Sequence, residues 1–120
     1  MARILMVNDE IDLLRLCQDT LQDSGHEVEI STSGREAIAR AQAVKPDLVI
    51  VDWIIPDMDG HSLLANLKAI PGLEDVPALA ISALQDGAAF AARAGADDFL
   101  QKPFDADELV DAVAQVLSRT

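Results

Sequence analysis

The stretch Leu48-Val49-Ile50-Val51-Asp52 decides the fold, because four apolar residues in a row end on a carboxylate. A short apolar run of this length is typical of a strand that is covered on both faces of a sheet. Asp52 would then lie at the carboxyl end of its strand, the edge at which open α/β sheets bind their ligands. Two other apolar runs end in the same way, and the polar residues that follow them are Asn8-Asp9-Glu10 and Ser82.

Length and composition predict one domain over residues 1–120, since half of the 120 residues are apolar and can form one core. The formal net charge of −12 argues against nucleic acid contact, because such a field repels phosphates. No apolar run approaches the ~20 residues that span a bilayer. The single cysteine, Cys17, excludes an intrachain disulfide and suits a reducing compartment, so we expect a cytoplasmic protein.

Short apolar runs alternate with helical patterns along the whole chain. This alternation over five units predicts a mainly parallel, three-layer α/β sheet. The fourth helix is weakly marked, because it consists mostly of alanine with Phe90 as its one large apolar side chain. We therefore expect it to be the least firmly packed element. The predicted strands are 3–7, 27–30, 48–52, 78–82 and 97–101, and the predicted helices include 10–23, 61–70 and 86–94, with two more starting after Ser33 and Asp105.

The acids at the predicted sheet edge indicate a cation site. Asp9, Glu10 and Asp52 would repel one another unless a cation lies among them. A site lined by a few hard oxygen ligands suits Mg²⁺, which keeps several waters and binds phosphate. The alternative is that these acids are helix N-caps, and Asp9 could cap the first helix.

Lys102 follows the fifth predicted strand, so it would lie near the acids. A lone lysine at a strand end is usually a solvated charge, but beside an acid cluster it becomes a partner for phosphate or carboxylate. A cis Lys102–Pro103 bond would aim its side chain inward. Ser82 has a simpler alternative as a hydrogen-bonded turn residue.

Taken in order, these motifs resemble the receiver domain of bacterial two-component response regulators, of the single-domain chemotaxis type, over essentially the whole chain. The resemblance implies a flavodoxin-like, doubly wound α/β fold. Its five-stranded parallel sheet would have the order 2-1-3-4-5, with two of five helices on one face and three on the other. The residues that carry the resemblance are Asn8-Asp9-Glu10, Asp52 with Pro56 and Asp59-Gly60, Ser82-Ala83, Asp97-Asp98-Phe99 and Lys102-Pro103-Phe104.

The resemblance implies that Asp52 is the phosphoacceptor. A phosphohistidine on a sensor histidine kinase or phosphotransfer protein would donate the phosphoryl group. Mg²⁺ would be held directly by Asp9, Asp52 and the backbone carbonyl of Ile54, and through water by Asn8.

The same resemblance implies residues that sense the phosphoryl group. Lys102, Ser82 and Ala83 would bind it, and Ser82 and Phe99 would act as the switch. The face formed by the fourth helix, fifth strand and fifth helix would then change its affinity for a downstream protein partner. Such a domain is a signalling phosphoacceptor that catalyses only its own phosphorylation and dephosphorylation, not a turnover enzyme.

Three departures from the family pattern lead to further expectations. Asn8 replaces a carboxylate, which should weaken Mg²⁺ binding without abolishing it. Ile54 and Leu84 occupy the two positions that tune hydrolysis, and neither can orient water, so a slowly decaying phosphoaspartate is expected. The segment from Ser82 to Lys102 is about two residues shorter than in typical receivers, which predicts a short or irregular fourth helix.

Other classes of protein stay open on the sequence alone. A degenerate receiver could act as a constitutive protein-binding module, with Asn8 as the first sign of lost phosphorylation. A phosphohydrolase resembling the haloacid dehalogenase group would need a second aspartate where Ile54 stands. Flavin binding would need a Ser/Thr/Gly-rich phosphate loop after the first strand and a tyrosine to stack on the flavin ring, and the chain has neither.

Overall fold

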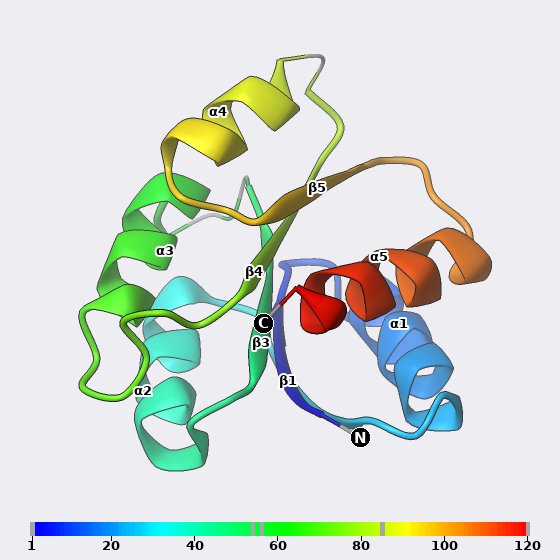
Figure 1. Ribbon diagram of the computed structural model, residues 1–120, viewed down its shortest axis with the longest axis horizontal. Helices are drawn as coiled ribbons and strands as arrows, with labels where there is room; N and C mark the ends of the chain where they lie inside the picture. The colour runs from blue at the N-terminus through cyan, green and yellow to red at the C-terminus, as the bar shows by residue number, and fades with distance from the viewer. Residues whose placement is uncertain (1, 54, 56, 85, 120) are drawn as a thin grey trace.

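The computed structural model of this protein describes residues 2–53, 55, 57–84 and 86–119, in which strands and helices alternate (Figure 1). The strands are β1 (Arg3–Val7), β2 (Glu27–Ser31), β3 (Leu48–Asp52), β4 (Ala78–Ser82) and β5 (Asp98–Gln101). The helices are α1 (Ile11–Asp23), α2 (Gly34–Val44), α3 (Gly60–Lys68), α4 (Gly87–Arg93) and α5 (Ala106–Ser118). The predicted elements are confirmed, with small shifts at their ends.

The five strands form one parallel sheet in the order β2-β1-β3-β4-β5, which confirms the predicted topology. The register aligns the carboxyl ends of neighbouring strands: Val7 pairs with Val51, and Asp52 pairs with Ile81. The polar residues that follow β1, β3, β4 and β5 therefore meet at one edge of the sheet.

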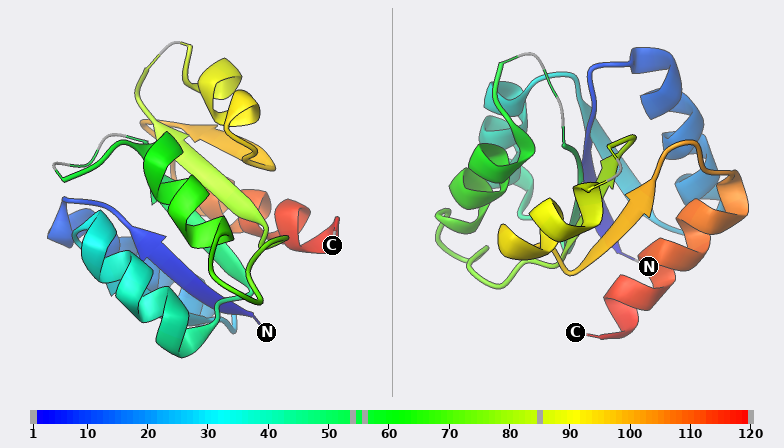
Figure 2. Two further views of the ribbon diagram at one scale, coloured as in Figure 1. Left: turned by 90° about the vertical axis from the view of Figure 1, so that its left-hand side faces the viewer. Right: turned by 90° about the horizontal axis from the view of Figure 1, so that it is seen from above.

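Helices cover both faces of the sheet (Figure 2). Leu5 and Val7 of β1 pack in the core beneath α2, α3 and α4, whereas Ile4 and Met6 pack in the core beneath α1 and α5. Successive side chains of a strand point to opposite faces, so an uninterrupted apolar run supplies both cores. Cys17 of α1 lies in the second core, and this burial raises the pKa of its thiol to about 11.

The shortness predicted for the fourth helix is confirmed, since α4 has only seven residues. Its buried residues are Gly87 and Ala91, while the Phe90 ring stays 46 % exposed. A hollow of about 220 Å³ lies between α4 and β5, beside Phe99. Small side chains leave α4 with little apolar area to bury, so the expectation that it is the least firmly packed helix stays a prediction.

Helix capping matches the local sequence. Asp105 and Glu108 form a reciprocal capping box at the start of α5, and the Ser33 hydroxyl accepts the Glu36 N–H at the start of α2.

In the part of the chain that the structure describes, no helix is long and apolar enough to cross a membrane.

Candidate functional site

Asp52 is the last residue of β3, the central strand, and its residue surface is only 4 % exposed. Its Oδ2 atom lies 2.8 Å from the Lys102 ammonium, which donates a hydrogen bond to it. A charge-assisted hydrogen bond of this length is strong, so it fixes the orientation of both side chains. The pair joins β3 to the segment after β5, fifty residues further along the chain.

Lys102 reaches Asp52 from a segment whose Lys102–Pro103 peptide bond is cis. Burial alone would lower the pKa of Lys102. The hydrogen bond to Asp52, together with the charges of Asp52 and Glu10, outweighs it and raises the pKa above its usual value. The ammonium therefore stays protonated and offers a fixed positive charge at the edge of the sheet.

The predicted acid cluster is present. Carboxylate oxygens of Asp9, Glu10 and Asp52 lie within 4.8 Å of one another, and Glu10 Oε1 lies 3.6 Å from Lys102 Nζ. Asp9 and Glu10 are exposed while Asp52 is buried, so the cluster opens to solvent on one side. Three carboxylates on a solvent-facing rim are the donors that Mg²⁺ takes while keeping water ligands, so this set fits a magnesium ion.

Asn8 lies at the base of this cluster and is completely buried. Its Oδ1 atom accepts the Glu10 N–H at 2.8 Å, and its Nδ2 atom has no hydrogen-bond partner among the described residues. The N-cap of α1 is Glu10, whose side chain makes no capping bond within the described structure. The alternative that Asp9 caps α1 is therefore wrong, and the Asp9 carboxylate is left for another role.

Ser82 ends β4 beside Asp52 and is buried. Its Oγ atom accepts the Leu84 N–H at 3.0 Å, and its carbonyl accepts the Lys102 N–H at 2.9 Å. Ser82 thus makes the turn contact considered as its simpler role, and it also links β4 to the lysine. Ala83 and Leu84, which follow it, are exposed.

The half-buried Phe99 ring lies close to the start of α4. A Cβ atom added to Gly87 would come within 2.7 Å of this ring and 3.3 Å of the Ser82 Cβ. Ser82, Gly87 and Phe99 are therefore packed together, which only a residue without a side chain at position 87 allows. The remaining predicted site residue, Ile54, lies outside the described residues.

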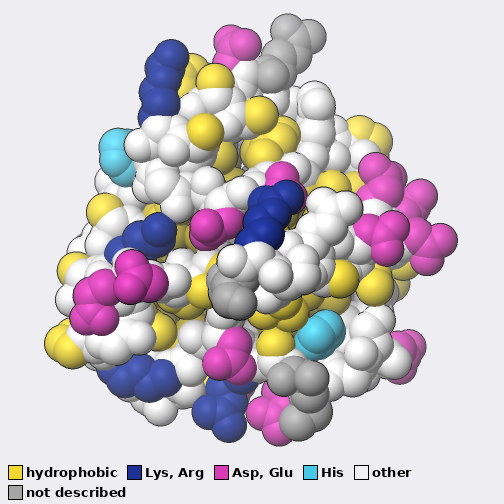
Figure 3. All heavy atoms as spheres, viewed as in Figure 1, with side chains coloured by type: hydrophobic (Ala, Val, Ile, Leu, Met, Phe, Trp, Pro, Cys, Tyr) yellow, Lys and Arg dark blue, Asp and Glu magenta, His cyan; other side chains and the backbone are white. Residues whose placement is uncertain are grey.

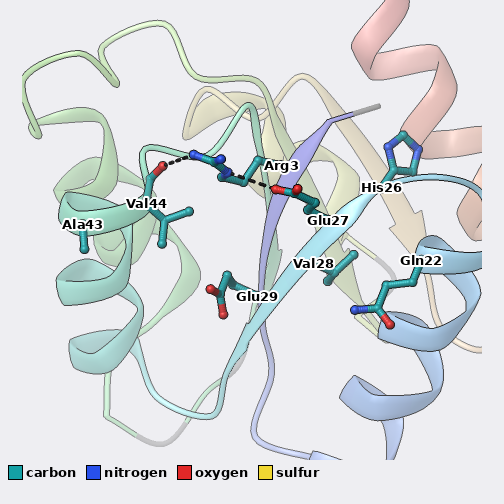
Figure 4. Close-up of a pocket in the computed structure, with 8 residues that line it drawn as sticks. All are labelled: Arg3, Gln22, His26, Glu27, Val28, Glu29, Ala43 and Val44. Carbon is teal, nitrogen blue, oxygen red and sulfur yellow. Dashed lines mark hydrogen bonds and ion pairs between the residues drawn. The ribbon is translucent and has the colours of Figure 1, made fainter.

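Two hollows flank the sheet at opposite ends. One of about 390 Å³ adjoins the acid cluster and is lined by Glu10, Leu13, Ala83, Lys102, Pro103 and Phe104. A larger one of about 700 Å³ lies where β1 and β2 begin, at the end of the strands away from the Asp9–Glu10–Asp52 cluster (Figure 4). There the Arg3 guanidinium donates to the Val44 carbonyl and pairs with the Glu27 carboxylate at 3.4 Å, so these two charged groups already have partners.

His26 also lines this second hollow and is half-buried. Its Nδ1 atom accepts the Ala2 N–H at 3.1 Å. Partial burial lowers the pKa of His26. This partial burial arises because the turn before β2 folds back beside the start of β1.

Comparison with known proteins agrees with this geometry. A family model described as "Response regulator receiver domain" matches residues 4–114. The chain belongs to the response regulator receiver domain family. Receiver domains are the phosphoacceptor modules of two-component signal transduction, and the buried Asp52 beside an acidic rim is consistent with that role.

Individual receiver relatives show the same likeness. Transcriptional regulatory protein PrrA of Mycobacterium leprae is 38 % identical over 119 residues, which cover 98 % of this chain and 50 % of PrrA. Chemotaxis response regulator CheY4 of Vibrio cholerae has a TM-score of 0.91 at 31 % identity, covering 97 % of this chain and 98 % of CheY4. A putative response regulator from Chloroflexus aurantiacus has a TM-score of 0.91 at 32 % identity, covering 98 % of each chain. This receiver domain thus spans about half the length of PrrA but nearly all of CheY4.

Sequence reasoning missed two features of this receiver. One is the ion pair between Glu10 and Lys102, which depends on how α1 starts. The other is Asp57, whose carboxylate accepts the Gly34 and Arg35 N–H groups at the start of α2. In both cases the residues that contact each other are far apart in the sequence, so no local motif could have indicated the contact.

Proposed function

We propose that this receiver domain, spanning residues 1–120, is a phosphorylation-controlled switch in which Asp52 is the phosphoacceptor. The observation that carries the proposal is the buried Asp52 carboxylate, bonded to Lys102 at 2.8 Å and opening onto an acidic rim. Phosphoryl transfer asks a protein mainly for positioning and for neutralisation of charge. Lys102 supplies one fixed positive charge, and a bound cation would supply the rest.

Mg²⁺ is the cation that this donor set suits. Asp9 and Asp52 are proposed as direct ligands, with the Ile54 carbonyl as a third and Asn8 acting through water. Glu10 lies in the same cluster, so its charge adds to the attraction for the ion. When bound, the ion neutralises charge on the transferring phosphoryl group.

In the proposed reaction, an Asp52 carboxylate oxygen forms a bond to phosphorus as the bond from phosphorus to the donor's imidazole nitrogen breaks. The donor is a phosphohistidine of a sensor histidine kinase or phosphotransfer protein. Lys102, the Ser82 hydroxyl and the Ala83 backbone would hold the phosphoryl oxygens. The product is an acyl phosphate on Asp52 and a free histidine on the donor, so the domain is no turnover enzyme.

The new group carries a charge of about −1.5 to −2, which can bias a two-state element. Ser82 and Phe99 are the proposed switch, because both contact the start of α4 around Gly87. The small apolar area that α4 can bury favours its movement. Leu84 is exposed and apolar, and together with Ile54 it offers no group to orient water, so we propose a long-lived phosphoaspartate.

A protein partner is proposed for the face formed by α4, β5 and α5. Phe90 is exposed on α4, and acidic side chains gather on the side where α5 begins (Figure 3). The exposed acids of α5 and its N-cap are Asp105, Asp107, Glu108 and Asp111. This charge repels nucleic acid and favours a partner that presents basic residues.

The test is intact mass after incubation with acetyl phosphate and Mg²⁺, beside an Asp52→Asn control. One phosphoryl adduct on the wild type and none on the control is expected, and its decay rate measures the lifetime. An Ile54→Asn, Leu84→Glu variant should shorten that lifetime.

A second candidate is a constitutive protein-binding module, favoured by the neutral Asn8 at the base of the cluster. Under that function the wild type takes no adduct, and Trp53 fluorescence does not respond to Mg²⁺. Partner affinity would also be the same for the wild type and Asp52→Asn.

A further inference from the structure

The loop that follows Asp52 is closed at its base. The Gly60 N–H donates to the Trp53 carbonyl at 3.0 Å, so the first and last residues of the segment 53–60 are joined. Gly60 also lies against the indole, because a Cβ added there would sit 2.5 Å from two ring atoms. Trp53 is 7 % exposed and is therefore held firmly beside Asp52.

The outer part of the same loop is tied to a different element, α2. Asp57 Oδ1 accepts the Gly34 N–H at 2.9 Å, and Oδ2 accepts the Arg35 N–H at 3.0 Å. These bonds lower the pKa of Asp57, with the bond from Gly34 as the largest cause. Met58 packs against Gly34 so closely that a Cβ there would lie 2.6 Å from its Cγ.

Helix α2 does not depend on Asp57 alone for capping. Its own N-cap, Ser33, accepts the Glu36 N–H at 3.2 Å. Asp57 satisfies two other donors of the first turn, which a helix otherwise leaves to water or to neighbouring groups. A carboxylate at a helix N-terminus also gains from the helix dipole. The two hydrogen bonds to Asp57 therefore also fix the loop that follows Asp52, here called the acceptor loop, to α2.

We propose that Asp57 is a positioning residue that holds the acceptor loop in the shape that binds Mg²⁺ at the Asp9–Asp52 rim. The inference rests on the proposed function, because it concerns the same metal site. If the loop is competent only while Asp57 bridges to α2, releasing it lowers the competent fraction and weakens the apparent affinity in proportion. Linkage requires the reverse effect too: bound Mg²⁺ must favour the bridged loop and protect the first amides of α2.

The experiment compares two variants that remove acceptors from the same helix end. Asp57→Ala removes the bridge to the loop, whereas Ser33→Ala removes the N-cap of α2 and leaves the bridge in place. Mg²⁺ titrations are followed by Trp53 fluorescence, and hydrogen exchange of the Gly34 and Arg35 amides is measured with and without Mg²⁺.

We expect Asp57→Ala to raise the half-saturating Mg²⁺ concentration at least about threefold, and Ser33→Ala to leave it unchanged although both variants unfold more easily. Asp57→Asn, which keeps one acceptor oxygen, should lie between. In the wild type, Mg²⁺ should slow exchange at Gly34 and Arg35.

Equal Mg²⁺ affinity for the wild type and Asp57→Ala would overturn the inference. Hydrogen-exchange rates of the Gly34 and Arg35 amides that do not change when Mg²⁺ is added would overturn it too. Phosphorylation of the wild type by acetyl phosphate, measured in parallel by mass, separates the two levels. An adduct on Asp52 with unchanged affinity in Asp57→Ala leaves the proposed function standing and removes only the role of Asp57. A wild type with neither adduct nor Mg²⁺ response removes both.

Discussion

Replacing Lys102 with methionine should destabilise the metal-free protein, because it removes the ammonium that pairs with the buried Asp52 and with Glu10. Opposite charges 2.8 Å apart attract by roughly 6 kcal/mol at an effective dielectric of ~20. Desolvation offsets much of this, yet breaking a buried pair still costs about 3–5 kcal/mol. The Lys102 side chain is 21 % exposed, so we expect the low end, about 3 kcal/mol.

The opposite substitution should behave differently. Asp52→Asn removes one of three mutually repelling carboxylates, and Lys102 keeps Glu10 at 3.6 Å. We expect its free energy of unfolding to stay within about 1 kcal/mol of the wild type. The two variants that break the same ion pair should therefore differ clearly.

The assay is urea unfolding with EDTA at pH 7, followed by circular dichroism. For an m-value of ~2 kcal/mol/M, Lys102→Met should lower the midpoint by about 1.5 M. Lys68→Met is the matched control, since Lys68 donates to the Gly95 carbonyl and has no acid partner in the described structure. If Asp52→Asn destabilises as much as Lys102→Met, the repulsion argued for the acid cluster is wrong.

Three further predictions follow from other parts of the structure. Asn8→Asp should lower the half-saturating Mg²⁺ concentration in a Trp53 fluorescence titration, because it restores a carboxylate at the base of the cluster. An equal or higher half-saturating concentration in the variant would contradict this. His26 accepts the Ala2 N–H and has a lowered pKa, so its neutral form favours folding and this contribution is lost as pH falls below about 6.5. The urea midpoint should therefore fall more between pH 7.5 and pH 5.5 for the wild type than for His26→Gln. Gly60→Ala should destabilise by about 1–3 kcal/mol, since the new methyl would sit 2.5 Å from the Trp53 ring, and an unchanged thermal midpoint would refute it.

Much of the site could be predicted because its residues follow apolar runs. Asp52, Ser82 and Lys102 each stand where a strand ends, and a parallel sheet brings such ends together whatever the details of packing. The same logic could not assign Asn8 its hydrogen bond to Glu10, because the turn after β1 had to be folded first. Nor could it indicate that His26 would be half-buried, since its partner Ala2 is 24 residues away.

The sequence by itself determined the strand and helix order, the two-sided core and the edge at which the polar residues gather. These depend on patterns within about ten residues, where backbone geometry and side-chain spacing decide the outcome. Only the tertiary structure decided which charges meet. The 2.8 Å contact of Lys102 with Asp52 and the bridge from Asp57 to α2 join segments 22 to 50 residues apart. Hydrogen bonds and ion pairs act over a few ångströms, so they depend on the folded position of each loop.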